Sequence, residues 1–199
     1  MLHGSGKFSE AVPLVQRALA IREKLLGPEH PDVAESLDSL AGLYRDQGRY
    51  AEAERLYRRA LVIGEKALGP EHPRVAASLN NLAGLYHAQG KYEQAEPLYR
   101  RAIAIGEKVV GPGHPNVAAS LNNLAMLYIA QDKYAEAEPR YRRALAILEK
   151  TLGPKHPDVA TVLESLAVVL RKTNRAAEAQ RIEARVRTIK VTNMKGNSD

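Results

Sequence analysis

The chain has 199 residues, a formal net charge of +6 and no cysteine, and 45% of its residues are hydrophobic. It contains no apolar run long enough to span a membrane, and without cysteine it can form neither disulfides nor thiolate metal sites, which suits a cytoplasmic protein. Most of the excess positive charge falls after residue 170, so the nearly neutral body predicts no nucleic-acid binding and the basic end indicates a soluble terminal helix and tail.

The first predicted element is a helix over residues 8–26, in a segment that runs from 8 to 27. Its apolar stripe consists of Phe8, Ala11, Leu14, Val15, Ala18 and Leu19. Such a stripe is typical of a helix packed between two others. Residues 1–7 supply only the last fragment of a preceding helix, and we expect them to be a disordered remnant.

Four copies of the segment Gly-Pro-x-His-Pro follow, at a period of 42 residues, with histidines at positions 30, 72, 114 and 156. The two units that start at Pro73 and Pro115 are identical at 30 of 42 positions. One unit of this length buries its apolar face only against the next, so the period predicts a continuous array. Four histidines also suggest a metal site, but no carboxylate or cysteine recurs with them at ligand spacing. We interpret them as structural groups beside helix starts and predict no metal and no cofactor.

Each unit is predicted to form two helices. In the unit that starts at Pro73, the first apolar stripe is Leu79, Leu82, Ala83 and Tyr86. Gly90 then suits the left-handed conformation that follows a helix end. The second stripe is Tyr92, Ala95, Leu98, Tyr99, Ala102 and Ile103. By this register, the first helices begin near Pro31, Pro73, Pro115 and Pro157, and the second helices begin near Tyr50, Tyr92, Tyr134 and Arg175.

The hairpins therefore span residues 31–69, 73–111, 115–153 and 157–190, with a disordered tail at 191–199. The last hairpin differs from the others because Glu183 and Arg187 replace an aromatic and an aliphatic residue of the second stripe. A polar outer face is what a terminal helix of an array requires. We predict that the fourth hairpin is a C-terminal cap.

The pattern Leu79, Leu82, Ala83, Tyr86, Gly90, Tyr92, Ala95, Tyr99, Ala102 resembles the signature of the tetratricopeptide repeat (TPR). The 42-residue form, with Leu-Asn-Asn-Leu-Ala at 79–83, is similar to the kinesin light chain class, which many bacterial scaffold proteins share. This resemblance implies an all-α solenoid, a right-handed superhelix of antiparallel helix-turn-helix hairpins. It also implies a non-catalytic protein-interaction scaffold that binds an extended peptide or a partner helix in its concave groove.

In such arrays the first helices line the groove, and the stripe beside their core face is available to a ligand. The candidate groove residues are Asp38, Arg45, Asn80, Asn81, Gly84, His87, Asn122, Asn123, Met126, Glu164 and Arg171. An asparagine both donates and accepts, so a row of them can hold the backbone of a peptide. The resemblance points to Asn81 and Asn123 as the residues that face the ligand. The alternative is that these amides bond only to neighbouring helices or water.

Two other patterns are weaker signals of function. The arginine pairs at 58–59, 100–101 and 142–143 could form a basic ridge for an acidic partner, but a glutamate precedes the first member of each pair by four residues. That spacing favours surface ion pairs on one helix. Gly4-Ser5-Gly6-Lys7 hints at a phosphate loop, yet the outer positions of that motif do not match. No catalytic residues are predicted, and we expect no enzyme.

Two further interpretations stay open. The uncovered stripe of the first helix suggests that the chain begins within the array, either as a truncated reading frame or as a protein whose missing helix comes from a partner. The chain could then be the repeat part of a larger signalling or effector enzyme. Alternatively, it is a structural module that self-associates through its N-terminal helix.

Overall fold

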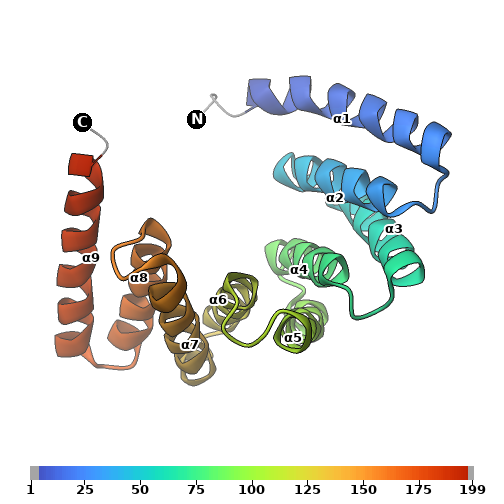
Figure 1. The fold of residues 1–199 in the computed structure, drawn as a ribbon. Helices are drawn as coiled ribbons and strands as arrows, with labels where there is room; N and C mark the ends of the chain where they lie inside the picture. Colours follow the sequence, from blue (N-terminus) through green and yellow to red (C-terminus); the bar gives the residue numbers. More distant parts are fainter. Residues whose placement is uncertain (1–4, 197–199) are drawn as a thin grey trace. The chain divides into compact units, whose positions relative to one another are not determined.

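The structure, a computed structural model, describes residues 5–196, with side chains for residues 11–194. The described residues form nine α-helices and no strand (Figure 1). The helices are α1 (Ser5–Leu26), α2 (Pro31–Asp46), α3 (Tyr50–Leu68), α4 (Pro73–Ala88), α5 (Tyr92–Val109), α6 (Pro115–Ile129), α7 (Tyr134–Leu152), α8 (Pro157–Lys172) and α9 (Ala176–Gly196). The all-α prediction is confirmed.

The chain divides into two compact units, residues 1–105 and 106–199. In the first unit α1 packs on α2, α2 on α3 and α3 on α4 (Figure 1). In the second, α6 packs on α7, α7 on α8 and α8 on α9. Within each unit these helices thus pack on their neighbours in sequence, as a hairpin array requires. None of the helices described here combines the length and the apolar character needed to cross a membrane.

Each first helix begins at the proline that the repeat predicts, and the histidine before it is the N-cap. In α4, His72 Nδ1 accepts a hydrogen bond from the backbone N–H of Arg74 at 3.1 Å. The same bond forms at His30, His114 and His156, at 3.1–3.2 Å. The cap satisfies one of the backbone donors that a helix start leaves without an intrahelical partner. The structural interpretation of the four histidines is confirmed.

The turns inside the hairpins need a left-handed residue. Gly48 and Gly90 adopt φ angles of 74° and 71°, and at the same register Asp132 and Asn174 adopt 57° and 61°. Aspartate and asparagine enter this region more readily than other residues that carry a side chain. The turn geometry is thus conserved between hairpins even where the glycine of the pattern is absent.

The core consists of the two predicted stripes. In the first unit Val33, Ala34 and Leu37 of α2 pack with Ala60 and Ile63 of α3, and Leu19 of α1 and Leu56 of α3 add to this cluster. Tyr57, Tyr99 and Tyr141 are among the largest fully buried side chains. Small residues of both helices, such as Ala41 and Ala53, are fully buried as well, which lets the two helices of a hairpin approach closely.

The helix ends differ from the expected boundaries at the two termini. α1 begins at Ser5, so residues 5–7 are helical rather than disordered, and α9 continues to Gly196, beyond the boundary expected at residue 190. The extension is anchored because Asn193 Nδ2 donates to the backbone oxygen of Lys155 at 3.0 Å. Residues 1–4 and 197–199, and the side chain of Phe8, lie outside what the structure describes.

A recurring ion pair joins each second helix to the one before it. Arg101 of α5 lies 2.6 Å from Glu65 of α3 and also donates to the backbone oxygen of Pro70 at 3.2 Å. Equivalent pairs join Arg59 to Glu23, Arg143 to Glu107 and Arg185 to Glu149. The first arginine of each predicted pair bonds instead to the glutamate four residues earlier. The expected neutralised face is confirmed.

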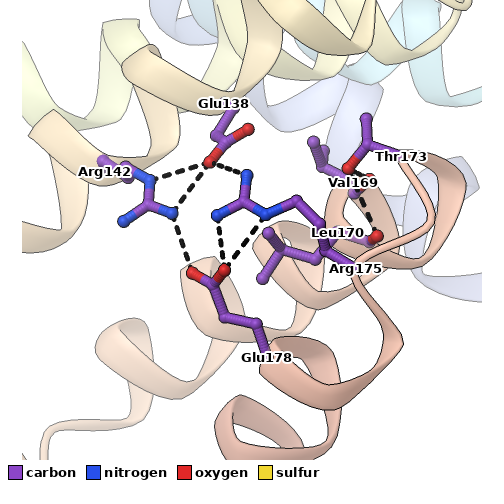
Figure 2. Close-up of polar contacts among 7 residues, drawn as sticks. All are labelled: Glu138, Arg142, Val169, Leu170, Thr173, Arg175 and Glu178. Carbon is purple, nitrogen blue, oxygen red and sulfur yellow. Dashed lines mark hydrogen bonds and ion pairs between the residues drawn. The ribbon is translucent and has the colours of Figure 1, made fainter.

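The last hairpin is tied to α7 by a four-residue network (Figure 2). Glu138 lies 2.6 Å from Arg175 and 2.8 Å from Arg142, and Glu178 bonds to both arginines. In the first unit the equivalent Glu54 accepts instead from the hydroxyl of Tyr86 at 2.9 Å. In α8 the residue equivalent to Tyr86 is Leu170, which has no hydroxyl, and Arg175 donates to Glu138 instead.

α1 carries an exposed apolar row that shares Leu14 with the predicted stripe, whereas Leu19 of that stripe packs against the core cluster of α2 and α3. Leu14, Ile21 and Leu25 are 69%, 48% and 74% exposed. One repeat later, Leu56 and Ile63 occupy the positions of Leu14 and Ile21 and belong to the core cluster with α2. The exposed face of α1 is thus the face on which a first helix packs in a complete hairpin.

Candidate functional site

The predicted groove residues lie on the first helices α2, α4, α6 and α8, at three recurring register positions and the residues beside them. We call the exposed stripe that they form the first-helix surface, and describe it separately for the two units. In each unit this surface contains one pocket of about 340 Å³. The first pocket lies between α2 and α4 and the second between α6 and α8.

The first pocket is lined by residues of three helices. They are Pro31, Ala34, Glu35, Asp38 and Ser39 from α2, Gly64 and Leu68 from α3, and Arg74, Ala77, Ser78 and Asn81 from α4. Two of the predicted residues, Asp38 and Asn81, are therefore brought together here. Glu35 and Arg74 stand at the exposed part of the lining, where Arg74 lies 3.2 Å from Asp32 and 3.7 Å from Glu35.

Asp38 has the most unusual environment of these residues. The Ser78 hydroxyl donates to its Oδ2 at 2.5 Å, while its Oδ1 is buried and has no hydrogen-bond partner among the described residues. Burial raises the pKa of Asp38 to about 6; the bond from Ser78 opposes this rise and the nearby charge of Glu35 adds to it. Because a buried acceptor without a partner is costly, the ionised form of Asp38 is destabilised in the folded protein.

Arg45 lies farther along α2, at the end of the first-helix surface. Its Nε donates to Asp46 at 3.0 Å, and the guanidinium reaches the space beside Gly84, where an added Cβ would lie 3.9 Å from it. The same Cβ would lie 3.6 Å from the hydroxyl of Tyr99. Gly84 thus leaves room between two helices that a larger residue would fill.

The remaining residues of α4 have mixed roles. Asn80 Nδ2 donates to the backbone oxygen of Ala76 at 3.3 Å, so part of its amide is directed to its own helix. His87 is half-buried beside Tyr92, with ring centroids 6.0 Å apart, and burial lowers its pKa. Only Asn81 of the two adjacent asparagines lines the pocket.

The second pocket repeats the first with different chemistry. Its lining residues are Pro115, Asn116, Ala118, Ala119, Asn122, Leu148, Leu152, Asp158, Thr161 and Val162. Asn122 stands at the register of Asp38, and Val162 at the register of Ser78. Since valine offers no hydroxyl, Asn122 Oδ1 is buried with no partner among the described residues, while its Nδ2 donates to the sulfur of Met126 at 3.6 Å. Asn123 does not line this pocket.

The predicted residues of α8 are engaged with the last helix. Arg171 forms a two-bond pair with Glu183 of α9, at 2.7 and 2.8 Å, and Glu164 pairs with Lys190. The charges that would end the predicted groove are therefore partly neutralised inside the protein. Sequence reasoning missed this because Glu183 was interpreted only as part of a polar outer face.

Ser78 and Asp158 were also missed as pocket residues. A signal for the serine existed, because Ser36, Ser78 and Ser120 recur at the 42-residue period and are the buried polar residues of the described core. A serine inside a helix commonly donates to the carbonyl oxygen four residues earlier, so the repeat alone does not distinguish this bond from one to a neighbouring helix. In α2 and α6 it returns to its own helix, whereas in α4 it bonds to Asp38.

Family models match most of the chain. A model described as the nephrocystin-3 TPR domain matches residues 1–110, and one described as tetratricopeptide repeat matches residues 75–150 and 116–190. Nephrocystin-3 of Xenopus laevis and of Mus musculus is 56% identical over 39 residues. That match covers 20% of this chain and only 3% of the length of nephrocystin-3.

Solved structures are similar over almost the whole chain. A putative kinesin light chain with nearly identical TPR-like repeats, from Podosopora anserina, is 34% identical, with a TM-score of 0.76, over 94% of this chain and 89% of that one. BtubC (BKLC) from P. vanneervenii is 29% identical, with a TM-score of 0.83, over 96% and 76%. The apo form of RapI, at 19% identity and a TM-score of 0.80 over 94% and 66%, shares the fold.

Proposed function

We propose that this chain, which belongs to the tetratricopeptide repeat family and is of its kinesin-light-chain-like class, is a non-catalytic scaffold that binds an extended peptide or a partner helix on its first-helix surface. TPR proteins are in general protein-interaction scaffolds. The observation that carries the proposal is the pair of pockets on this surface, each with a buried side-chain oxygen that lacks a donor among the described residues.

An extended peptide carries polar and apolar groups that match the lining of these pockets. An extended backbone presents an N–H donor and a C=O acceptor at each residue, and an amide such as Asn81 can bond to both. Ala77 and Ala119 are small and exposed, so they leave room for peptide side chains. Apolar contact comes from Leu68 in the first pocket and Leu148 and Leu152 in the second. The entropy that a flexible peptide loses when it becomes ordered offsets part of the binding free energy from these contacts, so we expect micromolar affinity.

The test is selection from a random peptide library, followed by titration of the selected peptides against variants. Ala77→Arg fills the first pocket, and Asn81→Ala and Asn123→Ala remove single amides. Ala104→Arg is the matched control, because Ala104 is exposed on α5, outside both pockets. Peptides selected on the parent should bind more weakly to Ala77→Arg and Asn81→Ala, and equally to Ala104→Arg. Equal binding to all these variants would contradict the proposal.

Self-association through α1 is a second candidate function, and the exposed stripe of Leu14, Ile21 and Leu25 favours it. Apolar residues in such a continuous row are unusual on a monomeric surface. Two copies could cover the row by packing α1 against its symmetry mate. Peptide binding and association use different faces, so the two candidates are compatible and are tested separately.

A further inference from the structure

The two pockets differ at the position where an acceptor is buried. In the second pocket this acceptor is the neutral amide of Asn122, and in the first it is the carboxyl group of Asp38. The two pockets have similar volumes and equivalent registers, so this difference is chemical rather than geometric. A neutral donor is sufficient for an amide oxygen. A buried carboxylate gains more from a charged donor, because hydrogen bonds between ionised groups are shorter and stronger.

The surroundings of Asp38 offer it no cation at contact distance among the described residues. On α2 the charged group that acts on Asp38 is Glu35, which carries the same charge. Arg45, on the same helix, is bonded to Asp46. From α3 it faces the hydroxyl of Tyr57, whose pKa burial raises to about 12, so this group stays neutral. From α4 it faces Ser78, which bonds to Oδ2, and Arg74, which is paired with Asp32 and Glu35.

We propose that the pocket between α2 and α4 takes a cationic side chain of the bound peptide, a lysine or an arginine, whose charged group lies against the carboxyl group of Asp38 in the pocket lining. This inference rests on the proposed peptide-binding function and names the class of residue that the first pocket selects. Asn81 and Ser39 stand beside Asp38 in the lining and offer further oxygens to the remaining N–H donors of the cation. The alkyl part of the side chain would lie against Ala34 and Leu68.

The ionisation of Asp38 then controls binding. Its pKa lies near 6, so the carboxyl is charged at pH 7.5 and largely neutral at pH 5. A lysine or arginine of the peptide keeps its charge throughout this range. Affinity for a basic peptide should therefore fall as the pH drops through 6. About one carboxyl in ten is still ionised one pH unit below the pKa, so the affinity for a basic peptide should be nearly tenfold lower at pH 5 than at pH 7.5.

The experiment selects peptides from a random library at pH 7.5 on the parent, on Asp38→Asn and on Glu93→Gln. Glu93 is the matched control, since it is an exposed carboxylate on α5 that lines neither pocket. The expected result is enrichment of lysine or arginine at one position on the parent and on Glu93→Gln, and no such enrichment on Asp38→Asn. Circular dichroism checks that all three are folded.

A selected peptide is then synthesised with lysine or norleucine at the enriched position and titrated between pH 5 and 8. We expect about a tenfold preference for lysine at pH 7.5, lost at pH 5 and in Asp38→Asn. Selected peptides without basic enrichment, or an equal preference in Asp38→Asn, would overturn this inference while leaving the peptide-binding proposal intact. If Ala77→Arg binds every selected peptide as tightly as the parent does, the peptide-binding proposal and this inference are both contradicted.

Discussion

The Ser78 hydroxyl of α4 donates to Asp38 Oδ2 of α2 at 2.5 Å, while the other carboxyl oxygen is buried without a partner among the described residues. One hydrogen bond does not compensate for burial, and the pKa of Asp38 rises from 3.8 to about 6. The folded protein therefore binds a proton at Asp38 that the unfolded chain has already released between pH 4 and 6. Stability from this group is highest below pH 4 and is lost as the pH rises through 6.

Asp38→Asn should accordingly stabilise the protein at pH 7.5, by up to about 3 kcal/mol, because it removes the buried charge but keeps an acceptor for Ser78. At pH 4 the gain should vanish. Urea unfolding of the parent and the variant at both pH values measures this difference. Glu164→Gln, at the same register but exposed, should show no gain of this kind, and an equal gain in the two variants would refute the burial argument.

Leu82→Ala and Leu124→Ala test the core register. Both side chains are almost fully buried, on α4 and α6 respectively, so each truncation should cost roughly 2–5 kcal/mol of unfolding free energy. Val62→Ala is the control, because Val62 lies 62% exposed on α3 and should change little. Thermal or urea unfolding gives the comparison. Unchanged melting of the two leucine variants would show that the stripes are assigned to the wrong face.

The histidine caps make a separate prediction. His72→Ala removes the acceptor for the Arg74 backbone N–H and should cost about 1 kcal/mol. His72→Asn should recover most of this loss, since asparagine is a favoured N-cap. Urea unfolding distinguishes the two variants. Equal stability of both would mean that the histidine acts by packing and not by its Nδ1.

The ion pair between Arg101 and Glu65 should be worth only a few tenths of a kcal/mol, because both side chains are partly exposed at 41% and 33%. A double-mutant cycle with Arg101→Met and Glu65→Gln measures the coupling. We expect it to shrink in high salt, since exposed pairs are screened. A coupling energy near zero, with a measurable cost of Arg101→Met alone, would indicate that the bond from Arg101 to the Pro70 oxygen dominates.

Association through α1 should depend on its exposed leucines. Leu14→Glu with Leu25→Glu places two charges in the stripe and should abolish any concentration-dependent increase in mass. Sedimentation velocity over a range of concentrations tests this. Val62→Glu, an equally exposed position on α3, should leave the association unchanged. A parent protein that is monomeric at all concentrations would remove this candidate.

Local signals explain why so much of the fold could be predicted. Pro73 fixes a helix start, His72 caps it and Gly90 ends the turn, and each of these effects involves only a few neighbouring residues. The period then copies them along the chain. The helix limits at the termini were less accurate, since α9 is extended by a contact between Asn193 and the Lys155 carbonyl, which no local pattern encodes.

The sequence by itself determined the hairpins, their stripes and the surface on which a ligand is expected, because these follow from helix periodicity and from turn residues. Only the tertiary structure decided which residues of that surface meet. It brings Asp38 and Asn81 into one pocket, leaves Asn123 out of the other, and pairs Arg171 with Glu183. The physical reason is that burial and hydrogen bonding depend on the neighbouring helix: Ser78 faces Asp38, whereas Val162 stands at the equivalent position beside Asn122.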